Sequence, residues 1–72
     1  MSKLPLLSGK EVCKTLSRIG FQPIRQRGSH LFMQHTDGRS TVVPMYKEID
    51  KILLKRILKE AEVGEDKFMK NL

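Results

Sequence analysis

Two arginines and a histidine fall within one six-residue stretch near the middle of the chain, Arg25-Gln26-Arg27-Gly28-Ser29-His30. An arginine guanidinium is a rigid fork of donors that matches a phosphate, and histidine is the side chain whose ordinary pKa lets it exchange a proton near neutrality. Gly28 permits a close backbone approach or a positive φ, and Ser29 offers a hydroxyl and an amide. These groups suit the holding of a phosphodiester and a proton transfer beside it, so His30 is the first candidate for catalysis.

The chain is short and basic. Its 72 residues allow one domain, residues 1–72, and a domain of this size buries only about 60% of its unfolded surface. Binding on an open surface is therefore favoured over enclosure of a small molecule. The net charge is +6, and residues 1–44 carry seven basic and two acidic side chains, against seven and six in residues 45–72. This field favours a polyanion such as nucleic acid near His30, although the same charge also suits a merely solvated surface.

Cys13 is the only cysteine, which excludes a disulfide within the chain and the usual thiolate set of a structural zinc site. The apolar segment 4–7 is too short for a signal peptide, and no stretch approaches the length of a membrane span. We expect a protein of the reducing cytoplasm without a metal site or cofactor. Cys13 itself is expected to be a small core residue rather than a nucleophile.

The elements that must position His30 follow from local signals. Ser8 and Glu11 form the pattern of a capping box, and Gly20 can end a helix in the left-handed conformation, which predicts a helix over residues 9–19. The chain then becomes strand-like, and the stretch 25–30 is expected where a loop opens into the strand 30–35. The pair Asp37-Gly38 favours a hairpin turn into the β-branched run 40–43, so three antiparallel strands are predicted.

A second helix is predicted after Asp50, whose side chain can act as the N-cap, and Gly64 is expected to end it. Its core stripe is expected to consist of Ile52, Leu53, Ile57, Leu58 and Ala61. Residues 65–70 are expected to add one short turn that buries Phe68. The result is an α+β fold in the order α-β-β-β-α, with both helices on one face of the sheet and the other face free.

Several of these segments together resemble the HicA (YcfA-like) toxin family. The similar features are Gly28-Ser29-His30-Leu31-Phe32, the Asp37-Gly38-Arg39 hairpin, Thr41-Val42-Val43-Pro44-Met45, the helix opening Glu48-Ile49-Asp50 with the later run 57–61, and the N-terminal segments 8–12 and 19–21. The resemblance spans nearly the whole chain. No single motif is decisive, and the ordered set at these spacings carries it.

The resemblance implies a fold like the double-stranded-RNA-binding domain and an mRNA endonuclease (mRNA interferase) toxin that blocks translation. It also implies a HicB-like antitoxin as partner and, for the histidine of the Gly-Ser-His motif, a catalytic role at His30. The chain departs from the family at two positions, because many relatives have a histidine where it has Tyr46 and a glycine where it has Ile52. Tyr46 either stacks on a base or simply lies at the rim of the fold.

The mechanism expected is metal-independent cleavage. His30 would act as general base on a ribose 2′-hydroxyl or as acid on the leaving 5′-oxygen, while Arg25, Arg27 or Lys47 stabilise the phosphate charge. His35, five residues along the same strand, should face the opposite way and have a structural or surface role. Two alternatives stay open: an RNA-binding module that does not cut, and a protein that binds an acidic partner surface.

Overall fold

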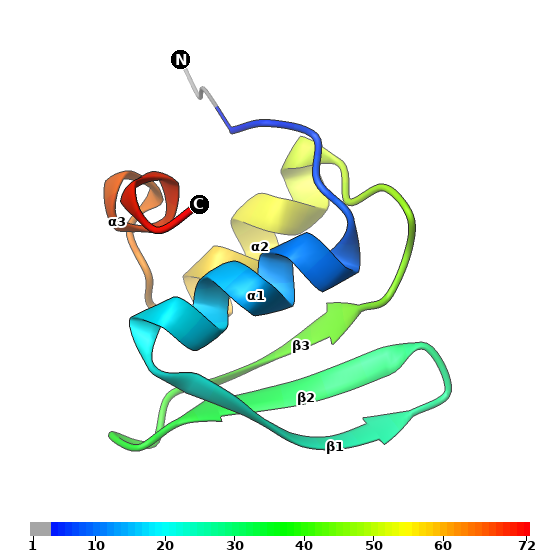
Figure 1. Cartoon of the computed structure of the whole chain (residues 1–72), viewed down its shortest axis with the longest axis vertical. Coiled ribbons are helices and arrows are strands. Elements are labelled where there is room, and N and C mark those ends of the chain that lie inside the picture. The colour runs from blue at the N-terminus through cyan, green and yellow to red at the C-terminus, as the bar shows by residue number, and fades with distance from the viewer. Residues whose placement is uncertain (1–3) are drawn as a thin grey trace.

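The structure, a computed structural model, describes residues 4–72 as six elements. They are α1 (Gly9–Ile19), β1 (Phe21–Arg27), β2 (His30–His35), β3 (Ser40–Pro44), α2 (Lys51–Ala61) and α3 (Glu65–Lys70). The three strands form one antiparallel sheet in the order β1-β2-β3. Helices α1 and α2 cover one face of this sheet, and α3 lies beside them away from the strands (Figure 1). The predicted α+β fold is confirmed, with α3 as the short final turn.

Helix α1 begins and ends at the predicted residues. The Ser8 hydroxyl accepts a hydrogen bond from the Glu11 N–H (3.1 Å), and the Glu11 carboxylate accepts one from the Ser8 N–H (2.9 Å), which completes the capping box. Gly20 ends the helix with a φ of 117°, a conformation that glycine adopts without steric cost. The chain therefore passes directly from α1 into β1, whose first residue, Phe21, is buried.

The prediction that Ile52 faces the core is wrong. Its side chain is 83% exposed, whereas Leu54, which the predicted stripe omitted, is completely buried. The buried residues of α2 are Leu54, Ile57, Leu58 and Ala61, which follow the spacing of one helical face. A residue two positions before Leu54 lies roughly 200° around the helix axis, so it points away from the sheet.

The predicted stop at Gly64 is also wrong. Helix α2 ends at Ala61, and Glu62 takes the left-handed conformation with a φ of 54°. The Val63 N–H donates to the Leu58 carbonyl (3.0 Å), the long bond of a Schellman motif. Both of these side chains are buried. Burial of Val63 thus ends α2 at the C-cap Glu62, although glutamate seldom takes the left-handed conformation. Gly64 is instead the N-cap of α3.

The hydrophobic core lies between the sheet and the helices, which leaves the other face of the sheet uncovered (Figure 1). Met33 of β2 and Val43 of β3 are buried on the helix side, so the residues that alternate with them point outward. Residues that pair across neighbouring strands point to the same face of the sheet, so the β1 residues that pair with Phe32 and His30 also point outward. We call this surface the open face; it includes Arg25, Arg27, His30, Phe32, Gln34, Ser40 and Val42.

Candidate functional site

His30 is the first residue of β2 and is exposed on the open face. It follows a two-residue turn, Gly28-Ser29, that joins β1 to β2. Gly28 has a φ of 58°, and a Cβ at this residue would meet nothing within 4 Å. Gly28 is therefore favoured by its left-handed backbone conformation, which is typical of a tight hairpin turn, and not by a lack of room for a side chain. Of the two possibilities that the sequence left open for Gly28, close backbone approach or a positive φ, the structure shows the positive φ.

Arg25 and Arg27 do not lie in a loop, as the sequence interpretation had them, but in β1. Arg27 pairs with His30 in the register, and Arg25 pairs with Phe32, so both arginines share the open face with His30. The Arg25 guanidinium carbon lies 5.1 Å from the centre of the Phe32 ring, within the range of a cation–π contact. Pairing across the hairpin, rather than loop flexibility, brings the arginines beside the histidine.

Tyr46 follows β3, and its ring meets the His30 ring edge-on, with centroids 6.4 Å apart and an interplanar angle of 73°. The side chain is 47% exposed. The backbone around it is held at two points, because the Met45 N–H donates to the Ser29 carbonyl (2.5 Å) and the Gly9 N–H donates to the Tyr46 carbonyl (2.8 Å). The β1–β2 turn, the segment after β3 and the first turn of α1 therefore converge at His30.

Gly9 allows this convergence, and the sequence analysis missed its role. A Cβ at Gly9 would lie 2.2 Å from the Pro44 carbonyl oxygen, so α1 and the end of β3 approach too closely for any other residue. The available signal was a glycine in the first turn of a helix, where it lowers helix stability and makes no cap of its own. Such a glycine indicates close packing against another segment.

Lys47 is exposed next to Tyr46. Its ammonium makes no hydrogen bond or ion pair with any residue in the part of the chain that is described, so it is available to a ligand. No hydrogen bond joins Lys47 to His30 among the described residues. Lys47 places a positive charge next to Tyr46 in the chain, and Tyr46 is the residue whose ring meets the His30 ring.

His35 lies at the other end of β2 and faces the helix side. Its ring meets the Phe21 ring edge-on at 5.2 Å, and its Nδ1 accepts a hydrogen bond from the Asp37 N–H (3.1 Å). The Asp37 carboxylate in turn accepts from the backbone and the side chain of Arg39, at 3.0 and 2.8 Å. The backbone hydrogen bond from Arg39 is the main cause that lowers the pKa of Asp37. The expected structural position of His35 is confirmed.

Residues 9–63 match the family model described as the HicA toxin of bacterial toxin–antitoxin systems. The chain belongs to the HicA toxin family. A comparison with curated proteins found no match. The HicA match begins at the first residue of α1 and ends just after α2, so it contains the sheet, His30 and the Tyr46 segment. Membership of this family implies an antitoxin as partner.

Cys13, the candidate nucleophile considered in this HicA-family chain, is buried in α1 with its sulfur 3.8 Å from that of Met45. Burial raises the pKa of the thiol to about 11, so the nucleophilic thiolate is scarce at neutral pH. The predicted core position is confirmed. Within residues 4–72, no three His, Cys, Asp or Glu side chains gather as a metal-binding group, and no helix is long and apolar enough to cross a membrane.

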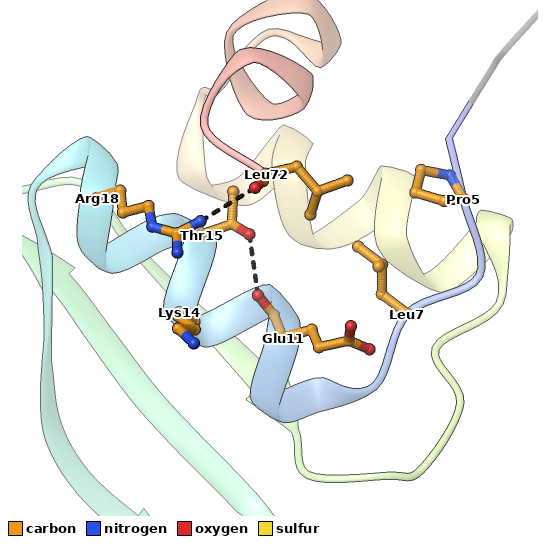
Figure 2. Close-up of a pocket in the computed structure, with 7 residues that line it drawn as sticks. All are labelled: Pro5, Leu7, Glu11, Lys14, Thr15, Arg18 and Leu72. Atoms are coloured by element: carbon orange, nitrogen blue, oxygen red, sulfur yellow. Dashed lines mark hydrogen bonds between the residues drawn. The ribbon is translucent and has the colours of Figure 1, made fainter.

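A hollow of about 320 Å³ lies on the helix side, between the N-terminal segment, α1 and the C-terminal residue. Figure 2 shows Arg18 donating to the Leu72 carbonyl (3.1 Å) and the Thr15 hydroxyl donating to the Glu11 carbonyl (2.9 Å). The Glu11 carboxylate is engaged in the capping box, so Lys14 is the remaining polar side chain of the lining. Because its polar groups already bind one another, this hollow is a weaker candidate than the surface around His30.

Proposed function

We propose that this HicA-family chain is the toxin of a toxin–antitoxin pair and acts in the cytoplasm as a metal-independent RNA endonuclease. Cleavage of mRNA would block translation, and a HicB-like antitoxin would cover the site. The observation that carries the proposal is the position of His30, exposed on the open face beside Arg27. No acidic residue occurs in β1, β2 or β3, so the surface around this histidine suits an anionic chain.

The proposed chemistry starts at the His30 imidazole. Neither ring nitrogen is hydrogen-bonded to another residue between positions 4 and 72, so the ring is free to exchange a proton with a substrate. As general base it removes the proton of a ribose 2′-hydroxyl while O2′ attacks the neighbouring phosphorus. The P–O5′ bond breaks, the leaving 5′-oxygen takes a proton from water, a 2′,3′-cyclic phosphate forms, and the protonated His30 then releases its proton to solvent. One such group contributes about 10²- to 10⁴-fold to the rate.

The cationic side chains would stabilise the charge that builds on the phosphate. Arg27 is directly opposite His30 in the hairpin, and Arg25 lies one register pair further along the open face. A guanidinium can donate two parallel hydrogen bonds to a phosphate, which favours these residues for the closest contacts. The turn Gly28-Ser29 adds backbone and hydroxyl groups beside them, and Lys47 contributes a more distant charge.

Tyr46 would act as a positioning residue. Its ring limits the orientation of the His30 ring through the edge-on contact, and its exposed side offers a surface on which a base can stack. In this chain it takes the position at which many relatives have a second histidine. The proposal therefore assigns proton transfer to His30 alone.

The test is cleavage of RNA by the purified protein in the presence of EDTA. The parent protein is expected to cut, and His30→Ala is expected to lose cutting and growth arrest while it keeps its fold and its RNA affinity. Affinity should fall with rising salt. RNA left intact by the parent protein, with His30→Ala binding equally well, would favour a module that binds RNA without cutting it. Salt-insensitive binding to an acidic protein would count against both.

A further inference from the structure

The open face has a hollow of its own, of about 270 Å³, a short distance along the sheet from His30. Its lining consists of Ile24, Arg25, Phe32, Met33, Gln34 and Ser40. The register of β1 and β2 is irregular between Pro23 and Arg25, which leaves Ile24 out of the regular pairing. The Ile24 side chain is 57% exposed. An apolar side chain is thus held toward solvent at the edge of a basic surface.

The lining combines the features that recognise a flat ring with polar edges. Ile24 and Phe32 supply apolar contact, and the Arg25 guanidinium already lies over the Phe32 ring. Gln34 and Ser40 are partners in the register of β2 and β3. Neither of their side chains is hydrogen-bonded to another residue within the described range. An amide and a hydroxyl offer both donors and acceptors to the edge of a base, and an arginine plane is a stacking surface.

The charge around the hollow favours RNA over a protein as its occupant. Asp37 is the only acidic residue between Val12 and Lys47, and its carboxylate is already bound by Arg39. The nucleotide that brings a base into the hollow also brings a phosphate to Arg25 and Arg27. A protein segment that is not acidic would gain the apolar contact but would bring no negative charge to Arg25 and Arg27.

The spacing connects the hollow to the proposed reaction. Phe32 is two residues beyond His30 on the same face of β2, a separation of roughly 7 Å along the strand. An unstacked nucleotide can span such a distance between its phosphate and its base. We propose that the hollow holds the unpaired base of a nucleotide adjacent to the phosphate at His30. This inference rests on the proposed function in taking RNA as the ligand, and it makes the substrate single-stranded at the cleavage point.

The test compares two exposed isoleucines in the His30→Ala protein, which is expected to bind RNA without cutting it. Ile24→Ala removes the apolar wall of the hollow, and Ile52→Ala removes an equivalent side chain from the outer face of α2 without changing the charge. Affinity is measured for a uridine decamer and for a decamer of abasic ribose phosphates, with thermal unfolding as the check of folding. Gln34→Ala is the second variant, since it leaves the β1 irregularity untouched.

We expect the His30→Ala protein without a further substitution to prefer the uridine decamer by roughly tenfold, because a stacked base contributes that order of affinity. Ile24→Ala and Gln34→Ala should reduce this preference severalfold and leave binding of the abasic decamer unchanged, whereas Ile52→Ala should change neither. Equal loss in the two isoleucine variants, or no preference in the His30→Ala protein itself, would overturn the base site even if the protein with His30 cuts RNA.

Two further outcomes separate this inference from the nuclease proposal. If the His30→Ala protein shows the base preference but the parent protein does not cut RNA, the nuclease proposal is overturned and the base site is supported. If Ile24→Ala leaves RNA affinity unchanged but weakens inhibition by the antitoxin, the hollow is a protein contact and the base site is overturned. The measurements of base preference, RNA cutting and inhibition by the antitoxin therefore distinguish a base site, a nuclease and a protein-binding hollow from one another.

Discussion

The two ends of β2 carry the same residue type in opposite settings. His30 is exposed on the open face, with no hydrogen bond from either ring nitrogen to any residue in the described range 4–72. His35 packs edge-on against Phe21, and its Nδ1 is occupied by the Asp37 N–H. A histidine whose ring is packed and whose Nδ1 is hydrogen-bonded contributes to the fold, whereas one with both ring nitrogens free can exchange protons with a ligand. The comparison indicates that environment, and not residue type, distinguishes the candidate catalyst.

The cause of the difference is the pleat of the strand. The two histidines are five positions apart in the strand, an odd offset, so they point to opposite faces of the sheet. Helices α1 and α2 cover one of these faces and leave the other free. The surroundings then follow: Gly20 lies against the His35 ring on one side, and Tyr46 and Arg27 approach His30 on the other.

The largest effect on stability is expected from Gly9→Ala, which disturbs the packing of α1 against the end of β3 near His30. The added Cβ would lie 2.2 Å from the Pro44 carbonyl oxygen, and the backbone of β3 must move to admit it. We expect a loss of about 3 kcal/mol in the free energy of unfolding, measured by urea denaturation. Gly64→Ala is the matched control, because its Cβ meets nothing within 4 Å. Equal stability of the two variants would contradict the close approach.

His35→Ala and His30→Ala should separate the two ends of β2 by stability. Removal of the His35 ring leaves a gap beside Phe21 and frees the Asp37 N–H, so we expect a loss of about 2 kcal/mol and a fall in Tm of roughly 10 °C. His30→Ala should leave Tm nearly unchanged because the side chain is exposed. Thermal unfolding followed by circular dichroism measures both, and the opposite order would refute the assignment of roles.

Tyr46 provides a smaller effect at the His30 end. Tyr46→Phe keeps the ring that meets His30, whereas Tyr46→Ala removes it. We expect the alanine variant to lose up to about tenfold in cleavage rate, consistent with the loss of a ring contact and a stacking surface, and the phenylalanine variant to stay close to the parent. Initial rates on a single-stranded RNA test this. A large loss in Tyr46→Phe would show instead that the hydroxyl takes part in the chemistry.

The smallest effect is expected from Asp37→Asn at the His35 end. The carboxylate accepts hydrogen bonds from Arg39, which lower the pKa of Asp37 below its ordinary value of 3.8. The ionised form therefore stabilises the fold above that value, and this contribution is lost as the pH falls through the lowered pKa of the folded state. Tm of the variant should be slightly below the parent near neutral pH, and the difference should close in acid. A difference that grows in acid would contradict this sign.

Much of the fold could be predicted because its signals are local. The capping box at Ser8, the left-handed Gly20 and the Asp37-Gly38 turn each determine a boundary through residues a few positions apart. The predictions that were wrong concern features that depend on packing between residues far apart in the sequence. Ile52 was assigned to the core because it is apolar, and Gly64 was expected to end α2, although burial of Val63 ends the helix earlier.

The candidate site was predictable in its residue types but not in its arrangement. The Gly-Ser-His motif and the family resemblance together indicated His30, and the spacing of the two arginines was visible in the sequence. Their common face could not be inferred while they were placed in a loop, since it depends on the register of β1 against β2. The contact between Tyr46 and His30 depends on the approach of α1 to β3 at Gly9, which no local pattern specifies.

The most direct test of the central claim is the single-turnover cleavage rate of a single-stranded RNA in EDTA by the parent, His30→Ala and His35→Ala. The temperature is kept well below the Tm of the least stable variant, so that each protein is folded. We expect His30→Ala to lose at least about 100-fold in rate, with products from the parent ending in a 2′,3′-cyclic phosphate, and His35→Ala to cut nearly as fast as the parent. Cutting by His30→Ala at the parent rate would contradict the account.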